Sequence, residues 1–258
     1  MKKYFVIAVA ATAMLSLNSC SNEEELTTAE GCGYISLNVS NDDAMVTRDV
    51  QPVTNISTWY AKVNNGTTDV YNEAIGTKLA TQPFAQGTYS VTVSNYASLS
   101  AANTAKDGWG DAYYEKTETE ISVTAGQTTS RTIACGTAKN AKFKLNTSGF
   151  SGTINEVVVK NSRTVTFKNS EGTLSKEAFF EAGDQLKYTI NYTINGINKT
   201  TAEKTLTLGG AATVNTLTIK SNSNGTINVT ITYNDTFTTG TEASIEFDAA
   251  TGNETNNN

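Results

Sequence analysis

The sequence of 258 residues contains no histidine. Histidine is the commonest general base at neutral pH and the commonest metal ligand, and it completes the Ser-His and Cys-His nucleophile arrangements. The sequence also lacks a phosphate-binding glycine loop, a Gly-x-Ser-x-Gly turn and a dinucleotide-binding glycine fingerprint. We therefore expect a protein that is not an enzyme and that uses no cofactor and no metal ion.

Positive charge is also scarce: 19 basic residues stand against 25 acidic ones, which gives a net charge of −6, and the basic residues form no tract. Nucleic acids and anionic lipid surfaces attract clustered Lys and Arg side chains. The composition therefore argues against a nucleic-acid partner and against electrostatic attachment to a membrane.

Carboxylates gather at Glu23–Glu25, at Asp42-Asp43 and around Asp107 and Asp111. The paired carboxylates of a glycosidase must face each other across a cleft, which a sequence does not reveal, and a calcium loop needs a ligand spacing that is absent here. We interpret these acidic residues as solvated loop residues.

The first twenty residues have the pattern of a bacterial lipoprotein signal. Two lysines precede the apolar run Tyr4–Leu17, which is too short to span a bilayer, and the run ends in Leu17-Asn18-Ser19-Cys20. This pattern predicts a signal peptide over residues 1–19, cleavage before Cys20, and lipid such as palmitate on the cysteine. The alternative is an ordinary secretory signal with a coincidental cysteine. Two or three acyl chains, at about 0.8 kcal/mol per buried CH₂, would anchor the protein to the outer membrane.

Residues 20–32 form the predicted tether between the lipid and the folded chain. Its acidic run, Ser21-Asn22-Glu23-Glu24-Glu25, is typical of a solvated spacer. The run also resembles the acidic export tag of surface lipoproteins in the Bacteroidetes, which implies a position on the outer face of the outer membrane. The periplasmic face is the alternative.

From Gly33 onward the sequence has a β pattern. Short segments rich in Thr, Val, Ile and Tyr alternate apolar and polar residues, as in Gly87–Val93 and Leu186–Ile194. The pairs Asn65-Gly66 and Asn195-Gly196 predict hairpin turns, because Asn-Gly tolerates the positive φ of a type I′ turn. Neither of the two prolines interrupts a strand.

A weak internal duplication predicts two domains. Ile121–Gly126 followed by Thr132-Ile133 resembles Leu206–Gly210 followed by Leu217–Ile219. We therefore predict an all-β fold of two tandem antiparallel β-sandwiches, with one elongated sandwich as the rival arrangement. The predicted ranges are 33–136 for the first sandwich, 137–250 for the second and 251–258 for a disordered tail. Short helical turns are expected only within Ala97–Ala105 and Ser175–Glu181.

Two cysteines remain if Cys20 is lipidated. In an oxidising periplasm, Cys32 and Cys135 can form a disulfide. This bond requires the strand that follows Cys32 to lie antiparallel to the strand that ends at Cys135, so that both residues reach the same edge. Two separately buried thiols are the equally weighted alternative.

Several of these segments together resemble a known family. The lipoprotein signal, the acidic tether, Gly33–Leu37 and Val46-Thr47-Arg48 look like the opening of fimbrillin-related lipoproteins of the Bacteroidetes. Gly87–Val93, and Ala112–Glu115 leading into Ile121–Thr129, resemble a family of such lipoproteins known only as a domain of unknown function. Cys135, Ala141–Phe143, Thr232–Thr236 and Ile245–Phe247 continue that likeness. The resemblance implies a surface-anchored protein with two sandwiches of transthyretin-like or immunoglobulin-like type, and it carries over no catalytic residue.

The first functional hypothesis is a pilin-like or pilus-accessory subunit. In fimbrillin-type pilins a protease cuts after an arginine that follows the first strand, the strand is lost, and a terminal strand of a neighbour takes its place. Arg48 is the candidate cleavage site and Thr241–Phe247 a candidate donated strand. Asp49 after Arg48 departs from the Thr-Arg-Ala usual in that family, and a solvated loop arginine is the alternative.

The second hypothesis is a surface module that binds a glycan or a host ligand. Trp109 lies in the glycine-flanked segment Asp107–Asp111 and is the best candidate for an exposed stacking residue. Other aromatic residues could join it, but most aromatics in alternating strands belong to the core. These are Trp59, Tyr60, Tyr113 and Tyr114.

Overall fold

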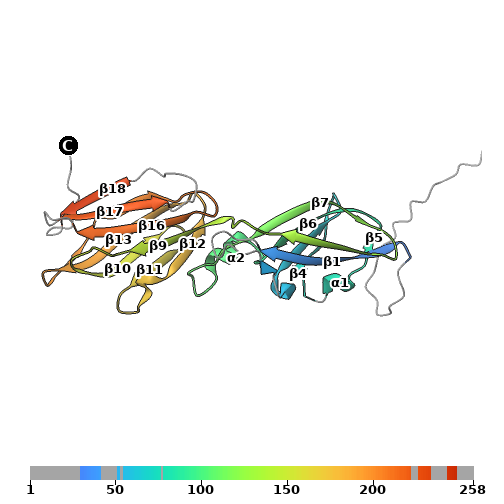
Figure 1. Cartoon of the computed structure of the whole chain (residues 1–258), viewed down its shortest axis with the longest axis horizontal. Coiled ribbons are helices and arrows are strands. Elements are labelled where there is room, and N and C mark those ends of the chain that lie inside the picture. The colour runs from blue at the N-terminus through green and yellow to red at the C-terminus, as the bar shows by residue number, and fades with distance from the viewer. Residues whose placement is uncertain are drawn as a thin grey trace, which may run out of the picture.

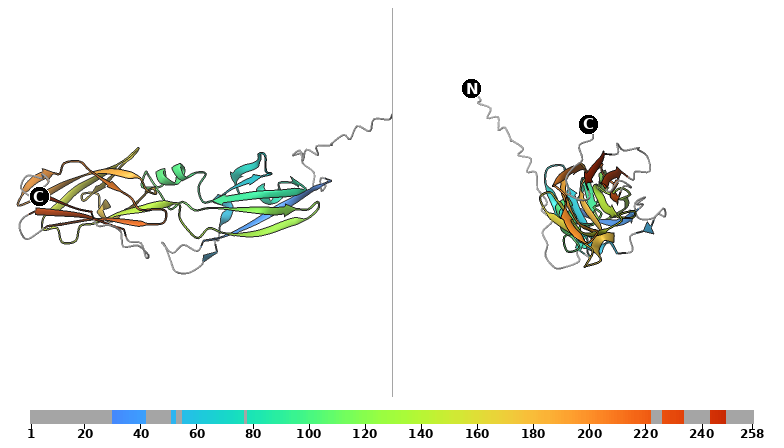
Figure 2. Two further views of the ribbon diagram at one scale, coloured as in Figure 1. Left: turned by 90° about the horizontal axis from the view of Figure 1, so that it is seen from above. Right: turned by 90° about the vertical axis from the view of Figure 1, so that its left-hand side faces the viewer.

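The protein consists of two β-sandwiches that lie end to end along the longest axis (Figure 1; Figure 2). The computed structural model describes residues 30–41, 51–52, 55–76, 78–221, 226–233 and 243–248. The first sandwich comprises β1 to β8 and the second β9 to β18, and the chain crosses between them after β8. The predicted all-β fold with two tandem sandwiches is therefore confirmed.

Two sheets form the first sandwich. One sheet has the order β4 (Asp69–Ala74), β3 (Tyr60–Asn64), β6 (Gly87–Ser94), β7 (Glu115–Val123). The other is built on β1 (Cys32–Asn41), with β8 (Thr128–Ala134) on one side and β5 (Phe84–Ala85) and β2 (Gln51–Pro52) on the other. The short helices are η1 (Ile56–Thr58), α1 (Lys78–Thr81) and α2 (Leu99–Thr104).

Two five-stranded sheets form the second sandwich. One has the order β11 (Thr164–Lys168), β10 (Thr153–Lys160), β13 (Gln185–Ile194), β14 (Ile197–Thr200), with β15 (Lys204–Thr207) also paired to β13. The other has the order β12 (Glu177–Glu181), β9 (Asn140–Asn146), β16 (Val214–Ser221), β17 (Thr226–Tyr233), β18 (Ala243–Asp248). A 3₁₀ turn, η2 (Thr173–Ser175), precedes β12.

Local sequence explains most of the turns. Asn195 and Gly196 have φ values of 50° and 78°, as a type I′ turn between β13 and β14 requires. The β3–β4 hairpin has a longer loop, in which the Asn65 side chain accepts hydrogen bonds from the amides of Thr67 and Thr68. The helical turn predicted in Ala97–Ala105 is α2, capped by the Ser98 hydroxyl.

The helical predictions were wrong in two respects. The short helices η1 and α1 lie outside the two segments in which helical turns were expected. The segment Ser175–Glu181 contributes only the last residue of η2, and then runs as strand β12. Three consecutive residues of this strand, Ala178, Phe179 and Phe180, are buried. Such a run fits a buried strand and a helix equally well, and the neighbouring strand β9 decides between them by pairing with β12.

Among the described strands, each sandwich contains one parallel pair, which the sequence analysis did not predict. In the first, β1 runs parallel to β8 over seven residue pairs, from Tyr34↔Thr128 to Ser40↔Ala134. In the second, β9 runs parallel to β16. The first strand of each sandwich thus lies beside a late strand of the same sandwich, which ties the two ends of the unit together.

This parallel pairing overturns the Cys32–Cys135 disulfide. Cys32 begins β1, whereas the amide of Cys135 donates a hydrogen bond to the carbonyl of Ser40 at the other end of that strand. Eight residues of extended strand separate these two ends, a distance of about 26 Å. Cys135 accordingly carries a free thiol and is buried.

Each sandwich has its own hydrophobic core. The first is formed by inward residues of the two facing sheets, among them Ile35, Val63, Val91, Ile121 and Ile133. The second is richer in aromatics and includes Phe143, Phe167, Phe180, Tyr188 and Tyr192. Phe179 of β12 packs into the first core although its strand belongs to the second sandwich, so the two units share a packed junction.

Candidate functional site

The feature that distinguishes the first sandwich is the position of strand β1 between β8 and the first core. We call this position the seat of β1. Ile35, Leu37 and Val39 alternate along the strand and point into the first core, with 0%, 5% and 3% of their surfaces exposed. Ser36 and Asn38, between them, are half-buried and exposed. β1 therefore contributes three fully inserted side chains while its other face remains accessible.

The two edges of β1 are held unequally. Along one edge β8 pairs with it over seven residues. Along the other edge, β5 pairs only with Cys32 and Gly33, and β2 pairs only with Ser40 and Asn41. Helix α1 also contacts the strand. In the described part of the chain, the middle of β1 thus has strand partners on one side only.

Gly33 makes the tightest contact in this seat. A Cβ atom added there would lie 2.3 Å from the carbonyl oxygen of Thr124 and 2.9 Å from that of Gln127. Both obstacles are backbone atoms, which cannot swing aside as a flexible side chain can. The turn at Gln127 also accepts a hydrogen bond of 2.9 Å from the amide of Tyr34. Any strand in this position must therefore have glycine at the place of Gly33.

The Cys135 thiol closes the far end of the same core. Only 2% of the residue is exposed, and its Sγ lies 4.0 Å from the carbonyl oxygen of Val93. Burial raises the pKa of this thiol to about 11, so it stays protonated at neutral pH. The residue acts as a small apolar packing group.

The junction between the sandwiches is organised by Asn140, the first residue of β9, which is completely buried. Its amide nitrogen donates to Oδ1 of Asn103 at 3.0 Å and to the carbonyl of Asp111 at 2.7 Å. Its side-chain oxygen accepts from the amide of Tyr113 at 3.0 Å. One side chain of the second sandwich thereby fixes the segment that follows α2 in the first.

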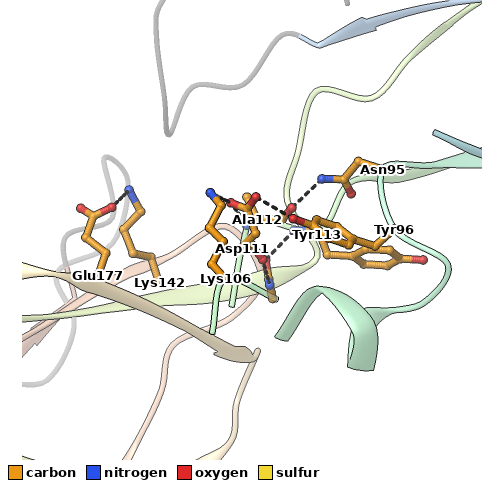
Figure 3. A network of polar contacts seen from close by, with 9 residues as sticks. Asn95, Tyr96, Lys106, Asp111, Ala112, Tyr113, Lys142 and Glu177 are labelled. Carbon is orange, nitrogen blue, oxygen red and sulfur yellow. Dashed lines mark hydrogen bonds and ion pairs between the residues drawn. The ribbon is translucent and has the colours of Figure 1, made fainter. Parts of the chain in front are cut away.

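The same segment carries a second layer of polar contacts (Figure 3). The Asp111 carboxylate accepts hydrogen bonds from the Tyr96 hydroxyl at 2.8 Å and the Ala112 amide at 2.9 Å, and it pairs with Lys106 at 2.9 Å. Burial, together with the bond to Asp111, raises the pKa of Tyr96 to about 12. The Asn95 side chain donates a hydrogen bond to the carbonyl of Ala112 and accepts one from the amide of Tyr114. Side chains of the first sandwich thus also fix the segment that follows α2.

Trp109 is part of this junction and is not an exposed stacking residue, contrary to the sequence prediction. Its ring is half-buried, meets Phe167 of the second core edge-on at a centroid distance of 5.0 Å, and has Lys176 Nζ 4.9 Å from its centroid. Arg163 donates to the carbonyls of Gly108 and Phe179 and fastens the same loop. The glycines beside Trp109 allow this loop to pack against the second sandwich. Gly110 has a positive φ, and a Cβ added there would lie 2.9 Å from each of two carbonyl oxygens.

The other aromatic candidates do not gather into a binding platform. Trp59, Tyr113 and Tyr114 are buried, at 7%, 5% and 5% exposure, and Tyr60 is half-buried on β3. The remaining predicted sites, Cys20 for lipid and Arg48 for cleavage, lie outside the described residues. Among the described residues, no helix has the length and apolar character needed to cross a membrane.

Sequence reasoning missed the role of Gly33, although a signal was present. A glycine that begins an alternating strand often marks a close approach of another backbone. It also missed Asn140, for which no sequence signal exists, because an asparagine at the start of a strand is usually solvated and the partners of Asn140 lie 27 to 37 residues earlier in the chain.

Comparison with known proteins places the chain in a family. A family model described as Domain of unknown function (DUF4493) matches residues 31–249. Among solved structures, the tip fimbrial protein Mfa3 from Porphyromonas gingivalis has 9% sequence identity and a TM-score of 0.42, with 78% of this chain and 99% of that chain covered. A fimbrial assembly protein from Parabacteroides distasonis has 10% identity and a TM-score of 0.44, with 78% and 96% covered.

No curated protein sequence matches the chain. The family match includes both sandwiches, from the start of β1 to the end of β18, and confirms the resemblance found in the sequence. The chain therefore belongs to the DUF4493 family, Domain of unknown function.

Proposed function

We propose that the protein is a non-enzymatic, fimbria-related structural subunit that joins its neighbours by strand exchange at the seat of β1. Cleavage after Arg48 releases β1, and an extended strand of a neighbouring subunit takes its place. The observation that carries the proposal is the unequal support of β1: three inserted side chains and a full partner on one edge, but only two-residue partners on the other.

Energetics favour refilling of the seat. Loss of β1 would leave Ile35, Leu37 and Val39 without replacements in a core where each was almost fully buried. Burial of an aliphatic side chain of this kind stabilises a fold by about 1.5–3 kcal/mol. The open backbone edge of β8 would add unpaired amides and carbonyls. An emptied seat is therefore strongly complementary to an apolar, extended segment, which is the chemistry of β-strand addition.

The same proposal includes the place of the protein in the cell. Until cleavage after Arg48 separates it from the sandwiches, lipid on Cys20 anchors the chain to the outer membrane, and the acidic tether presents both sandwiches at the cell surface, where a fimbrial subunit acts and where an adhesive role is available to it. Partners are other pilin-like subunits and the membrane that holds the lipid, and nucleic acid is not among them. Metabolic labelling with a palmitate analogue should label the protein but not its Cys20→Ser variant. Equal labelling of both would exclude this anchor.

Limited digestion of the full chain with an arginine-specific protease tests the exchange. The chain has three arginines, of which Arg131 and Arg163 lie within folded elements or their turns. We expect a new amino terminus at Asp49, followed by oligomers that grow with protein concentration. The Arg48→Gln variant should remain uncut and monomeric under the same conditions. Cleavage at Asp49 that leaves only monomers would overturn strand exchange, and cleavage elsewhere would overturn processing at Arg48.

A further inference from the structure

A cleft lies between the two sandwiches, near the junction that Asn140 organises. One wall is helix α2 of the first sandwich, which contacts strand β12 of the second (Figure 1). The other wall belongs to the second sandwich and is formed by the β10–β11 turn, the end of β12 and the turn before β13. The cleft has a volume of about 460 Å³, which is within the range of roughly 300–1,000 Å³ that small-molecule sites occupy. It shares no residue with the seat of β1.

Charged side chains of both signs line this cleft. The half-buried Arg163 donates hydrogen bonds to two backbone carbonyls of the junction. A guanidinium has five N–H groups, so these two bonds leave further donors available to a ligand. The carboxylates of Glu181 and Asp184 belong to the same wall. An anion would meet the two carboxylates and a cation would meet the guanidinium, so the charges together favour a neutral ligand.

Neutral side chains add both donors and acceptors to the cleft. Helix α2 contributes Ser100, Asn103 and Thr104, and the β10–β11 turn contributes Asn161 and Ser162. Within the described part of the chain, the hydroxyls of Ser100 and Ser162 make no hydrogen bond to another residue. Each hydroxyl group of a sugar also donates and accepts, so a ring with several adjacent hydroxyls can satisfy this mixed set.

Hydrogen bonds within the protein hold these side chains in place before any ligand arrives. Asn103 Oδ1 accepts a bond of 3.0 Å from Asn140, which leaves the Asn103 amide nitrogen as a donor. Asn161 Oδ1 accepts from the backbone amide of Arg163 at 3.0 Å, and Asn161 Nδ2 donates to Asp184 Oδ2 at 2.7 Å. Side chains that are already ordered lose little conformational entropy when they bind a ligand. The cleft is therefore prearranged on both walls.

We infer that this cleft binds a neutral saccharide between helix α2 and the two turns of the second sandwich. Asn103 and Arg163 donate hydrogen bonds to hydroxyl oxygens of the sugar, and Glu181 accepts from its hydroxyl groups. The half-buried Leu99 packs against the C–H groups of the ring. This site is separate from the stacking platform that the sequence predicted, because Trp109 does not line the cleft. It is also independent of strand exchange, since it uses neither β1 nor Arg48.

Nuclear magnetic resonance titration of the uncleaved full chain tests the site. The probes are glucose, galactose, N-acetylglucosamine, lactose and cellobiose, each added separately. A polar site that stays open to water binds weakly, so we expect a dissociation constant of about 1 mM for at least one sugar. The side-chain amide signals of Asn103 and Asn161 should shift together, because the ligand contacts both walls. Shifts on one wall only, or none with any of the five sugars at about 30 mM, would overturn the inference.

Two variants test the assigned contacts with the sugar that binds best. Glu181→Ala removes a charged acceptor from an exposed position and should weaken binding at least about tenfold. Glu171→Ala, at an exposed glutamate outside the cleft, is the matched control and should bind as the unmodified protein does. Ser100→Phe, at an exposed position of α2, should fill the cleft and abolish the shift at Asn161 without changing the melting temperature.

Equal affinities of Glu181→Ala and Glu171→Ala would overturn the inference. Lysine and glutamate, titrated in the same way, test the preference for a neutral ligand. Tighter binding of either amino acid than of every sugar, at the same signals, would identify a charged ligand and would also overturn the inference.

Discussion

The first strands of the two sandwiches occupy equivalent places but are held differently. β9 pairs with β12 along one edge and with β16 along the other, over five residues each. Among the residues that the structure describes, β1 has a full-length partner only in β8, and its second edge meets two short strands at its ends. The same position in the fold is thus fixed in the second sandwich and weakly held in the first.

The next strands of the two sheets, β8 beside β1 and β16 beside β9, differ in the opposite sense. β16 carries the two additional strands β17 and β18, whereas β8 pairs with no strand other than β1 among the described residues. The sheet of the first sandwich therefore ends at β8 within the described residues, whereas that of the second continues beyond β16. Four predictions test this contrast, from the largest expected effect to the smallest.

The largest effect is expected from a charge at the inner face of β1. Ile35→Asp buries an unpaired carboxylate at a position with 0% exposure and should destabilise the first sandwich by roughly 4 kcal/mol or more. In calorimetry of the full chain, the unfolding transition of the first sandwich should disappear while that of the second remains. Phe143→Asp on β9 should do the reverse. Asn38→Asp, on the exposed face of β1, is the control and should change stability by less than about 0.5 kcal/mol. Loss of both transitions in Ile35→Asp would show that the two cores are not independent.

The junction sets how far the two sandwiches act as separate bodies. Trp109→Ala removes the edge contact with Phe167 and the cation–π contact with Lys176, and should lower stability by about 2 kcal/mol. Small-angle X-ray scattering should show a larger radius of gyration, because the loop no longer fastens one sandwich to the other. Val70→Ala, on the outer strand β4, should change neither quantity. An unchanged scattering profile for Trp109→Ala would assign the rigidity of the junction to the hydrogen bonds of Asn140 and Arg163.

Hydrogen exchange compares the two first strands directly. Amides in the middle of β1 should exchange at least about tenfold faster than those in the middle of β9, since local opening of β1 breaks strand pairing on only one side. Mass spectrometry of peptides covering Ile35–Asn38 and Lys142–Lys144 measures this ratio. Equal protection of the two peptides would remove the contrast on which strand exchange is based.

The smallest effect concerns alkaline pH. The pKa of Cys135 is raised from 9.0 to about 11 by burial, so the unfolded chain loses this proton at a lower pH than the folded chain. Its contribution to stability is therefore complete below pH 9 and declines as the pH rises towards 11. The melting temperature of the first sandwich should fall less over this interval in Cys135→Ala than in the unmodified protein. The second sandwich has no cysteine, so the substitution should leave the pH dependence of its transition unchanged.

Particular residues show how far the sequence predicted the structure. The alternation of Gly87–Val93 and Leu186–Ile194 gave the correct strands and faces, and Asn195-Gly196 gave the correct turn. Trp109 was misplaced because glycines beside an aromatic residue indicate a loop but not the surface on which the loop lies. The Cys32–Cys135 disulfide was wrong because a parallel strand has the same two-residue alternation as an antiparallel one.

The sequence by itself determined that this chain forms β-strands with one apolar face, since side-chain alternation and turn residues act over a few neighbouring positions. Only the tertiary structure decided which strands pair, in which direction, and why glycine is needed, because those contacts join residues far apart in the chain. A Cβ added at Gly33 would lie 2.3 Å from the Thr124 carbonyl oxygen, and this conflict arises only because β1 lies beside β8.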